Sequence, residues 1–246
     1  MVRGSRRGMD MTRLLLFDID GTLVAGGPAK EAFHEALLAI FGTAGPIESW
    51  DFSGKTDPQI ARELLVEAGL ESERIEAGLD GLFEHYLKGM EARLPSVPTR
   101  ALPGVVSLMA ELDRRSRAGT VGLGLVTGNH VRGAALKLGS AGLDTPFFPE
   151  SGETVGAFGS DHEERNELPA IAVQRAKRSW RIDFEADNVV VIGDTPRDVA
   201  CGQAHGMRTM GVATGGFSAG ELERSGADIV VEDFSETERM LRFLLD

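Results

Sequence analysis

The chain has 246 residues, enough for one large domain or two smaller ones, and 42% of them are hydrophobic, so a sizeable core can form. Its 38 acidic and 26 basic residues give a formal net charge of −12, which argues against nucleic acid or an anionic membrane as a partner. The single cysteine, Cys201, excludes an intrachain disulfide and predicts a reducing, cytoplasmic location.

The N-terminal segment 1–10 carries three arginines. The apolar run that follows it is short and ends at Asp18, which does not fit a signal peptide. No apolar run approaches the roughly 20 residues that a membrane helix needs. We interpret the segment as a disordered arm, an expression remnant or a misplaced start, since Met11 would also serve.

The first predicted strand ends in two carboxylates. Leu14–Phe17 is a run of four apolar residues, as in a strand buried on both faces. Because side chains alternate along a strand, Asp18 and Asp20 point to the same side, where their charges repel unless a cation or a proton intervenes. Ligands of open α/β sheets bind at this end of the strands. The pair therefore predicts a site for Mg²⁺ and proton transfer, or else an ordinary polar turn.

A helical insertion is predicted after this strand. About eighty residues before Leu102 show no convincing strand, and a structureless loop of that length is improbable. Apolar residues recur at helical spacing in Ala29–Phe41, Pro58–Leu70 and Glu73–Leu94. We expect residues 24–98 to form a helical cap domain, and residues 1–23 and 99–246 to form the catalytic core.

The rest of the chain alternates strands with helices. The predicted strands are Val121–Val126, Val189–Ile192, Arg208–Val212 and Ile229–Val231, and the predicted helices are Val105–Leu112, Leu168–Trp180 and Ala200–His205. This alternation predicts an α/β fold with a Rossmann-like, three-layer parallel sheet.

Two of these strands also end in polar residues. Thr127 offers a hydroxyl, and Gly128 and Asn129 offer backbone N–H groups near a helix start, which would suit a phosphate, although such a sequence is also an ordinary turn. Asp194 follows the next strand, and Asp198 comes four residues later. These two carboxylates would complete an oxygen cage for Mg²⁺.

Together these motifs resemble those of the haloacid dehalogenase superfamily, most closely its phosphoglycolate-phosphatase-like branch. Asp18-Ile19-Asp20-Gly21-Thr22-Leu23, Val126-Thr127-Gly128-Asn129 and Gly193-Asp194-Thr195-Pro196-Arg197-Asp198 carry the resemblance, in the family's order. The helical insertion stands where that branch has its cap, and the resemblance covers nearly the whole chain from Met11.

The resemblance also implies a basic residue, usually a Lys, at the start of the helix before the last motif. The usual Lys-Pro is missing, so Arg165 and Lys177 are the candidates. Arg165 precedes the Leu168–Trp180 helix and falls at the active-site end, whereas Lys177 falls at the other end. We therefore expect Arg165 to bind the phosphate, in a fork where Lys would act as a point charge.

The mechanism that the resemblance implies is phosphoryl transfer through an aspartyl-phosphate. Asp18 would be the nucleophile, and Asp20 would protonate the leaving oxygen and then activate water. Asp18, the Asp20 carbonyl oxygen and Asp194 would hold Mg²⁺, with Asp198 orienting them. Thr127, Gly128, Asn129 and Arg165 would hold the phosphate, and Lys55, in a predicted cap loop, would reach an anionic group of the substrate.

Asp20 favours a phosphate ester or anhydride over a halide, because a leaving alkoxide needs a proton. The expected function is therefore hydrolysis of a small phosphorylated metabolite by a monomer or homodimer. The alternatives are a phosphomutase of the β-phosphoglucomutase type, an inorganic pyrophosphatase and a catalytically inactive binding module on the same fold. The family's mutases usually have a second motif with Ser and Ala, which Val126-Thr127-Gly128-Asn129 lacks.

Overall fold

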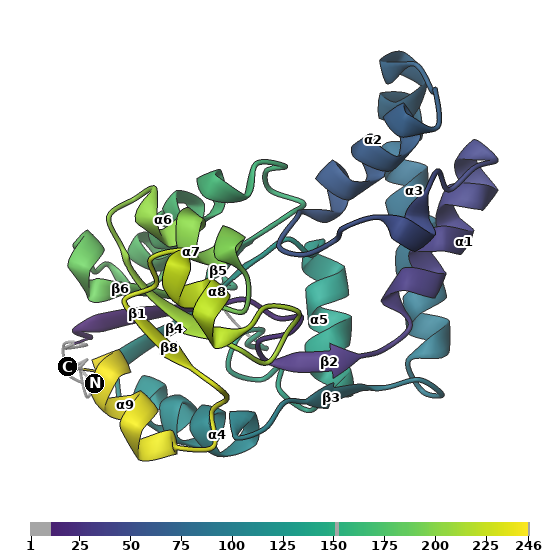
Figure 1. The fold of residues 1–246 in the computed structure, drawn as a ribbon. Helices are drawn as coiled ribbons and strands as arrows, with labels where there is room; N and C mark the ends of the chain where they lie inside the picture. The colour runs from purple at the N-terminus through teal and green to yellow at the C-terminus, as the bar shows by residue number, and fades with distance from the viewer. Residues whose placement is uncertain (1–10, 151–152, 246) are drawn as a thin grey trace.

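A six-stranded parallel sheet forms the centre of the computed structural model, which describes residues 11–150 and 153–245 (Figure 1). The segment 1–10, with its three interpretations, lies outside the described residues. The strand order is β5-β4-β1-β6-β7-β8, with every neighbouring pair parallel. The bounds are β1 Arg13–Phe17, β4 Val121–Thr127, β5 Gly156–Phe158, β6 Val189–Gly193, β7 Arg208–Val212 and β8 Ile229–Val231.

Helices cover both faces of this sheet, and the alternation of β1 shows why. Leu15 and Phe17 face a core with α4 (Val105–Arg117), α5 (Val131–Ser140) and α9 (Thr237–Leu245). Leu14 and Leu16 face a second core with α6 (Leu168–Trp180) and α7 (Pro196–Gln203). The short helix α8 (Ala219–Arg224) packs on β7 and β8. The predicted three-layer α/β fold is confirmed.

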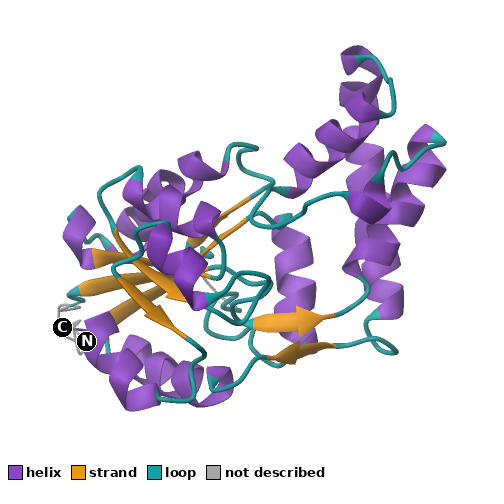
Figure 2. Cartoon of the chain, viewed as in Figure 1, coloured by secondary structure: helices purple, strands orange, loops and turns teal. Residues whose placement is uncertain are grey.

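Three further helices form a separate layer at one end of the sheet, on the right in Figures 1 and 2. They are α1 (Ala29–Phe41), α2 (Asp57–Glu67) and α3 (Ser72–Arg93), joined in part by a 3-10 turn at Ile47–Ser49. They share a hydrophobic cluster of their own, distinct from the two cores of the sheet. We call residues 24–98 the cap region; as a domain boundary, that range stays a prediction.

The chain enters and leaves the cap region through a short antiparallel ribbon. Strand β2 (Val24–Gly26) pairs with β3 (Thr99–Ala101), so the expectation of no strand between the first motif and Leu102 is wrong. Each strand has only three residues, too few for an alternating pattern to stand out. Helix α2 also begins one residue earlier than predicted, because the Thr56 side chain accepts a hydrogen bond from the backbone of Gln59 and caps the helix.

None of the helices in the described parts of the chain is long and apolar enough to cross a membrane.

Candidate active site

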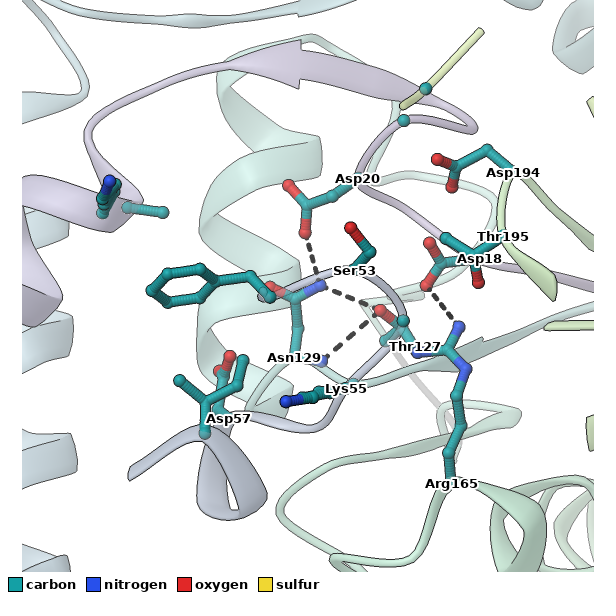
Figure 3. Close-up of a pocket in the computed structure, with 18 of the residues that line it drawn as sticks. Asp18, Asp20, Ser53, Lys55, Asp57, Thr127, Asn129, Arg165, Asp194 and Thr195 are labelled. Atoms are coloured by element: carbon teal, nitrogen blue, oxygen red, sulfur yellow. Dashed lines mark hydrogen bonds and ion pairs between the residues drawn. The ribbon is translucent and has the colours of Figure 1, made fainter. Parts of the chain in front are cut away.

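The carboxyl ends of β1, β4 and β6 meet at one edge of the sheet. Because β1 pairs with β4 on one side and β6 on the other, residues that follow these three strands become neighbours. They line a cavity of about 440 Å³ between the sheet and the cap region, shown in Figure 3. All of the site residues expected from the sequence line it except Asp198: Asp18, Asp20, Lys55, Thr127, Gly128, Asn129, Arg165 and Asp194.

Three of the carboxylates form a buried cluster. Asp18, Asp194 and Asp198 each place an oxygen within 4.8 Å of the others. Burial raises the pKa of Asp18 to about 6, against the opposing charge of Arg165. Burial and the negative charges of Asp18 and Asp198 raise the pKa of Asp194 to about 8. The cluster therefore has more negative charge than its environment can stabilise without a further cation or a proton.

Arg165 is the cation that this cluster contains. It lies in a 3-10 turn, Arg165–Glu167, just before α6, and one of its terminal nitrogens contacts both Asp18, at 3.0 Å, and Asp198. Burial alone would lower the pKa of Arg165, but the charges of Asp198 and Asp18 raise it. Lys177 instead lies on the surface and pairs with Asp183 at 2.5 Å.

Asp198 is held firmly behind this arginine. Its side chain accepts hydrogen bonds from the backbone N–H and hydroxyl of Thr195, at 3.0 and 2.7 Å. The first of these bonds, together with a bond from the Asp198 backbone N–H to the Thr195 hydroxyl at 3.3 Å, forms a capping box at the start of α7. The Asp198 carboxylate thus both caps α7 and pairs with Arg165.

Asp20 points toward a different set of partners. Its Oδ2 accepts hydrogen bonds from the Asn129 amide at 2.8 Å and from the Lys137 ammonium at 2.6 Å. The same ammonium donates to Oδ1 of Asn129 at 2.6 Å, and the Asn129 amide also donates to the Thr127 hydroxyl at 2.8 Å. Figure 3 shows Asn129 between Asp20 and Thr127. Asn129 therefore contributes its side chain to the site, where the sequence suggested only its backbone N–H.

Lys137 is the residue that sequence reasoning missed. It lies on α5, two turns beyond Asn129, and its side chain is 6% exposed. Burial would lower the pKa of Lys137, but the charges of Asp20 and Asp57 raise it, so the ammonium stays charged. The available signal was a lysine one residue before Leu138 and three after Ala134, on the apolar face of the helix.

Two glycines let the backbone approach the site closely. Gly21 has φ +79°, and a Cβ there would lie 2.3 Å from Oδ2 of Asp194. A Cβ on Gly128 would lie 2.0 Å from the carbonyl oxygen of Lys55, in the cap region. Both positions therefore need glycine for space, and the first also for its backbone conformation.

The loop before α2 brings the cap region onto the core. The backbone N–H of Asp57 donates to the Gly128 carbonyl at 2.8 Å, and its Oδ2 accepts from the backbone N–H of His130 at 2.7 Å. Burial raises the pKa of Asp57 to about 6 despite the charge of Lys137. Lys55 lines the cavity, but its ammonium pairs with Glu63 at 2.5 Å.

The carboxylate cluster fits a hard divalent cation. Such ions prefer carboxylate and carbonyl oxygens, and a positive ion beside Asp18 and Asp194 would offset the repulsion that raises their pKa values. Thr22 donates to Oδ1 of Asp194 at 3.2 Å and so helps to orient that carboxylate. A mononuclear oxygen site at the sheet edge is consistent with these residues.

A parallel sheet with carboxylates at its central strand ends and a helical insertion after the first strand defines a hydrolase of the haloacid dehalogenase type. The Hydrolase_like family model, described as HAD-hydrolase-like, matches residues 169–237. A phosphoglycolate phosphatase of Xylella fastidiosa is 31% identical over 87% of this chain and 85% of its own. A probable phosphatase IndB of Dickeya dadantii is 26% identical over 92% of each chain.

A solved structure has the same fold. A hydrolase from Pseudomonas syringae superposes with a TM-score of 0.69 at 24% sequence identity, covering 96% of this chain and all of that one. The chain belongs to the haloacid dehalogenase superfamily, in the branch of the phosphoglycolate phosphatases. It is an enzyme of the phosphoric monoester hydrolase class.

Proposed function

We propose that this enzyme hydrolyses a small phosphorylated metabolite of the cytoplasm through a phosphoryl group carried on Asp18, with Mg²⁺ as its metal. The observation that carries the proposal is the position of Asp18, at the end of the central strand, in contact with Arg165 at 3.0 Å and within the carboxylate cluster. An anionic nucleophile and a phosphate repel each other, so neighbouring positive charge is needed to offset that repulsion.

Asp18 would attack phosphorus through a carboxylate oxygen while the bond to the leaving oxygen breaks. Asp20, 47% exposed and open to the cavity, would give its proton to that leaving oxygen. In the second half, Asp20 would take a proton from water as the water attacks phosphorus. Inorganic phosphate leaves, and the Asp18 carboxylate and the protonated Asp20 are restored.

The remaining site residues would bind the phosphate and the metal and would orient the Asp20 carboxyl. Arg165 and Thr127 would hold the phosphate oxygens, and the backbone N–H groups at Gly128 and Asn129 would add to them. Asn129 and Lys137 would fix the direction of the Asp20 carboxyl. Asp18, Asp194 and the Asp20 carbonyl oxygen would hold Mg²⁺, with Asp198 orienting the set, and the metal would stabilise negative charge on the phosphoryl oxygens.

The cap region, residues 24–98, would close the cavity and exclude bulk water. Its loop contacts Gly128 and His130 directly, which supports this role. Lys55 lines the cavity, but the predicted contact of its ammonium with a substrate anion would require the ion pair with Glu63 to open.

The test is phosphate release from p-nitrophenyl phosphate and a panel of metabolite phosphomonoesters, with Mg²⁺ and with EDTA. We expect turnover that EDTA abolishes and that Asp18→Asn removes. Acid quenching during turnover should leave one phosphoryl group on the protein, labile to hydroxylamine, on the peptide that contains Asp18. Isomerised hexose phosphate instead of free phosphate would indicate the mutase, and turnover that survives both Asp18→Asn and EDTA would place the chemistry elsewhere.

A further inference from the structure

The half of the cavity that the cap region lines contains several large aromatic and aliphatic side chains. Phe33 comes from α1, Phe52 from the loop that follows, Ile60 from α2 and Tyr86 from α3. The whole cavity holds about 440 Å³, within the range of roughly 300–1,000 Å³ that is usual for sites of ligands far larger than a two-carbon acid. The side chains that surround this volume leave space for a ring.

The cations of the cap region that line the cavity are already neutralised. Lys30 pairs with Glu48 at 3.1 Å, and Lys55 pairs with Glu63 at 2.5 Å. Among the described lining residues, the cap region therefore offers no cation without a carboxylate partner. Its remaining charged residue there is Asp57, which is negative when ionised and accepts one hydrogen bond, from a backbone N–H.

Tyr86 adds an unused polar group to this half. The residue is 2% exposed and lines the cavity, and its ring packs edge-on against Phe33 with centroids 5.1 Å apart. Within the described residues this hydroxyl makes no hydrogen bond, and it is not fully buried, because the only fully buried side-chain nitrogen or oxygen without a partner there is Nε of Arg165. A hydroxyl that is open to the cavity and has no partner within the described protein is free to pair with a ligand group.

We propose that the substrate is a phosphomonoester whose alcohol portion contains a ring and has no charge, and that this half of the cavity binds that portion. The ring packs against Phe33 and Phe52, a donor of the substrate faces Asp57, and an acceptor faces the Tyr86 hydroxyl. A second anionic group, such as the carboxylate of phosphoglycolate, is disfavoured beside Asp57. The inference rests on the phosphatase activity proposed above and names the substrate class of that same site.

Three phosphates of primary alcohols distinguish the effect of a charge on the alcohol portion from the effect of its size. They are benzyl phosphate, ethyl phosphate and phosphoglycolate. All have poor leaving groups, so differences in kcat/KM report binding of the alcohol portion. We expect benzyl phosphate to exceed ethyl phosphate by about tenfold or more, from burial of the ring. We expect ethyl phosphate to exceed phosphoglycolate, because like charges repel across the site.

Single variants assign these preferences to residues. Asp57→Asn keeps an acceptor for His130 and should raise kcat/KM for phosphoglycolate several-fold with little change for benzyl phosphate. Phe52→Ala should lower kcat/KM for benzyl phosphate toward that for ethyl phosphate. Phe184→Ala, an equally half-buried phenylalanine packed against Trp180 outside the cavity, is its control.

The hydroxyl is tested with 3-hydroxybenzyl phosphate. Tyr86→Phe should lower the ratio of its kcat/KM to that of benzyl phosphate by about three- to tenfold, the effect of one hydrogen bond. An unchanged ratio would remove Tyr86 from the subsite.

The outcomes separate this inference from the proposed function. Asp18-dependent turnover of p-nitrophenyl phosphate together with a preference for phosphoglycolate over benzyl phosphate would overturn the inference alone. Absence of turnover with p-nitrophenyl phosphate and all three alkyl phosphates would overturn the proposed function, and the inference with it. A preference for benzyl phosphate that Phe52→Ala abolishes would support both.

Discussion

The two halves of the cavity are built on different principles. On the sheet side, charged residues come from strand ends and from neighbouring helices and turns, and they contact one another through short ion pairs and hydrogen bonds. On the cap side, aromatic residues come from two helices and a loop, Ile60 adds an aliphatic side chain from a third helix, and the two lysines pair with carboxylates of the cap region itself.

This difference shows which features of the enzyme can vary independently. The sheet topology brings the ends of β1, β4 and β6 together whatever the cap region contains, so the chemistry is fixed by the core. The cap region has a hydrophobic cluster of its own, so its cavity-facing side chains can change without disturbing that core. Variants of the two halves should therefore differ in kind: core variants in kcat, cap variants in the choice of substrate.

Among variants of the sheet side, Asp18→Asn should have the largest effect on activity. The amide cannot act as the nucleophile, so we expect kcat to fall by about 10⁴-fold or more for every substrate alike. The substitution also removes a buried negative charge, so the variant should fold and keep its melting temperature. The measurement is steady-state phosphate release beside a thermal melt. A folded variant with more than a hundredth of wild-type kcat would contradict the nucleophile assignment.

Arg165→Met tests the cation of the same network. Removing it leaves Asp18 and Asp198 buried and unpaired, which costs about 3–5 kcal/mol of the free energy of unfolding. Arg178→Met is the matched control, because Arg178 pairs with Glu153 on the surface, where such a pair contributes at most about 1 kcal/mol. Urea unfolding of the two variants measures the difference. Equal losses of stability in both would show that Arg165 does not neutralise the cluster.

Lys137→Met tests the partner of Asp20. Without the ammonium, Asp20 and Asn129 lose a shared donor, and we expect kcat to fall by about 10- to 100-fold because Asp20, the proposed general acid, is no longer held in place. The pH dependence of kcat should shift as well, which a purely structural role would not cause. Lys177→Met, which removes a lysine from an exposed ion pair, is the control and should leave kcat and its pH dependence unchanged. If the pH dependence of kcat were the same in Lys137→Met and the wild type, the role of Lys137 would be packing alone.

The sequence was informative wherever a residue directly followed a long buried strand. Asp18, Thr127 and Asp194 each take their position from a strand of at least five residues in the structure, and a parallel sheet has one carboxyl edge. The fold class followed from the same runs. Helix α1, helix α6 and strands β7 and β8 have the bounds expected from the sequence.

Residues that reach the site across the fold were harder to foresee. Lys137 enters from two helical turns away, and only the packing of α5 against the sheet points it at Asp20. Strands β2 and β3 are too short to carry a periodic signal, and each forms because the other lies beside it. The partner of Lys55 was likewise invisible, because Glu63 meets it only once α2 folds back on the loop.

The smallest effect concerns pH and metal. Asp194 has a pKa of about 8 in the folded protein, against 3.8 for an ordinary aspartate, so the folded protein holds a proton that the unfolded chain releases. With EDTA present, the free energy of unfolding should therefore fall by about 1 kcal/mol per pH unit between pH 6 and 8. Mg²⁺ binds the deprotonated carboxylates, so the stabilisation it provides should grow over the same range.

Thermal melts at pH 6, 7 and 8, with Mg²⁺ or EDTA, measure both trends at once. Asp194→Asn should flatten the pH dependence in EDTA and abolish the Mg²⁺ shift, because the amide neither titrates nor supplies a carboxylate. Asp183→Asn, at an exposed position, should behave as the wild type. If the EDTA-treated protein instead became more stable from pH 6 to 8, the carboxylate cluster would already be balanced by the protein's own cations. The sheet side would then resemble the two lysines of the cap side, whose charges are matched by carboxylates of the protein.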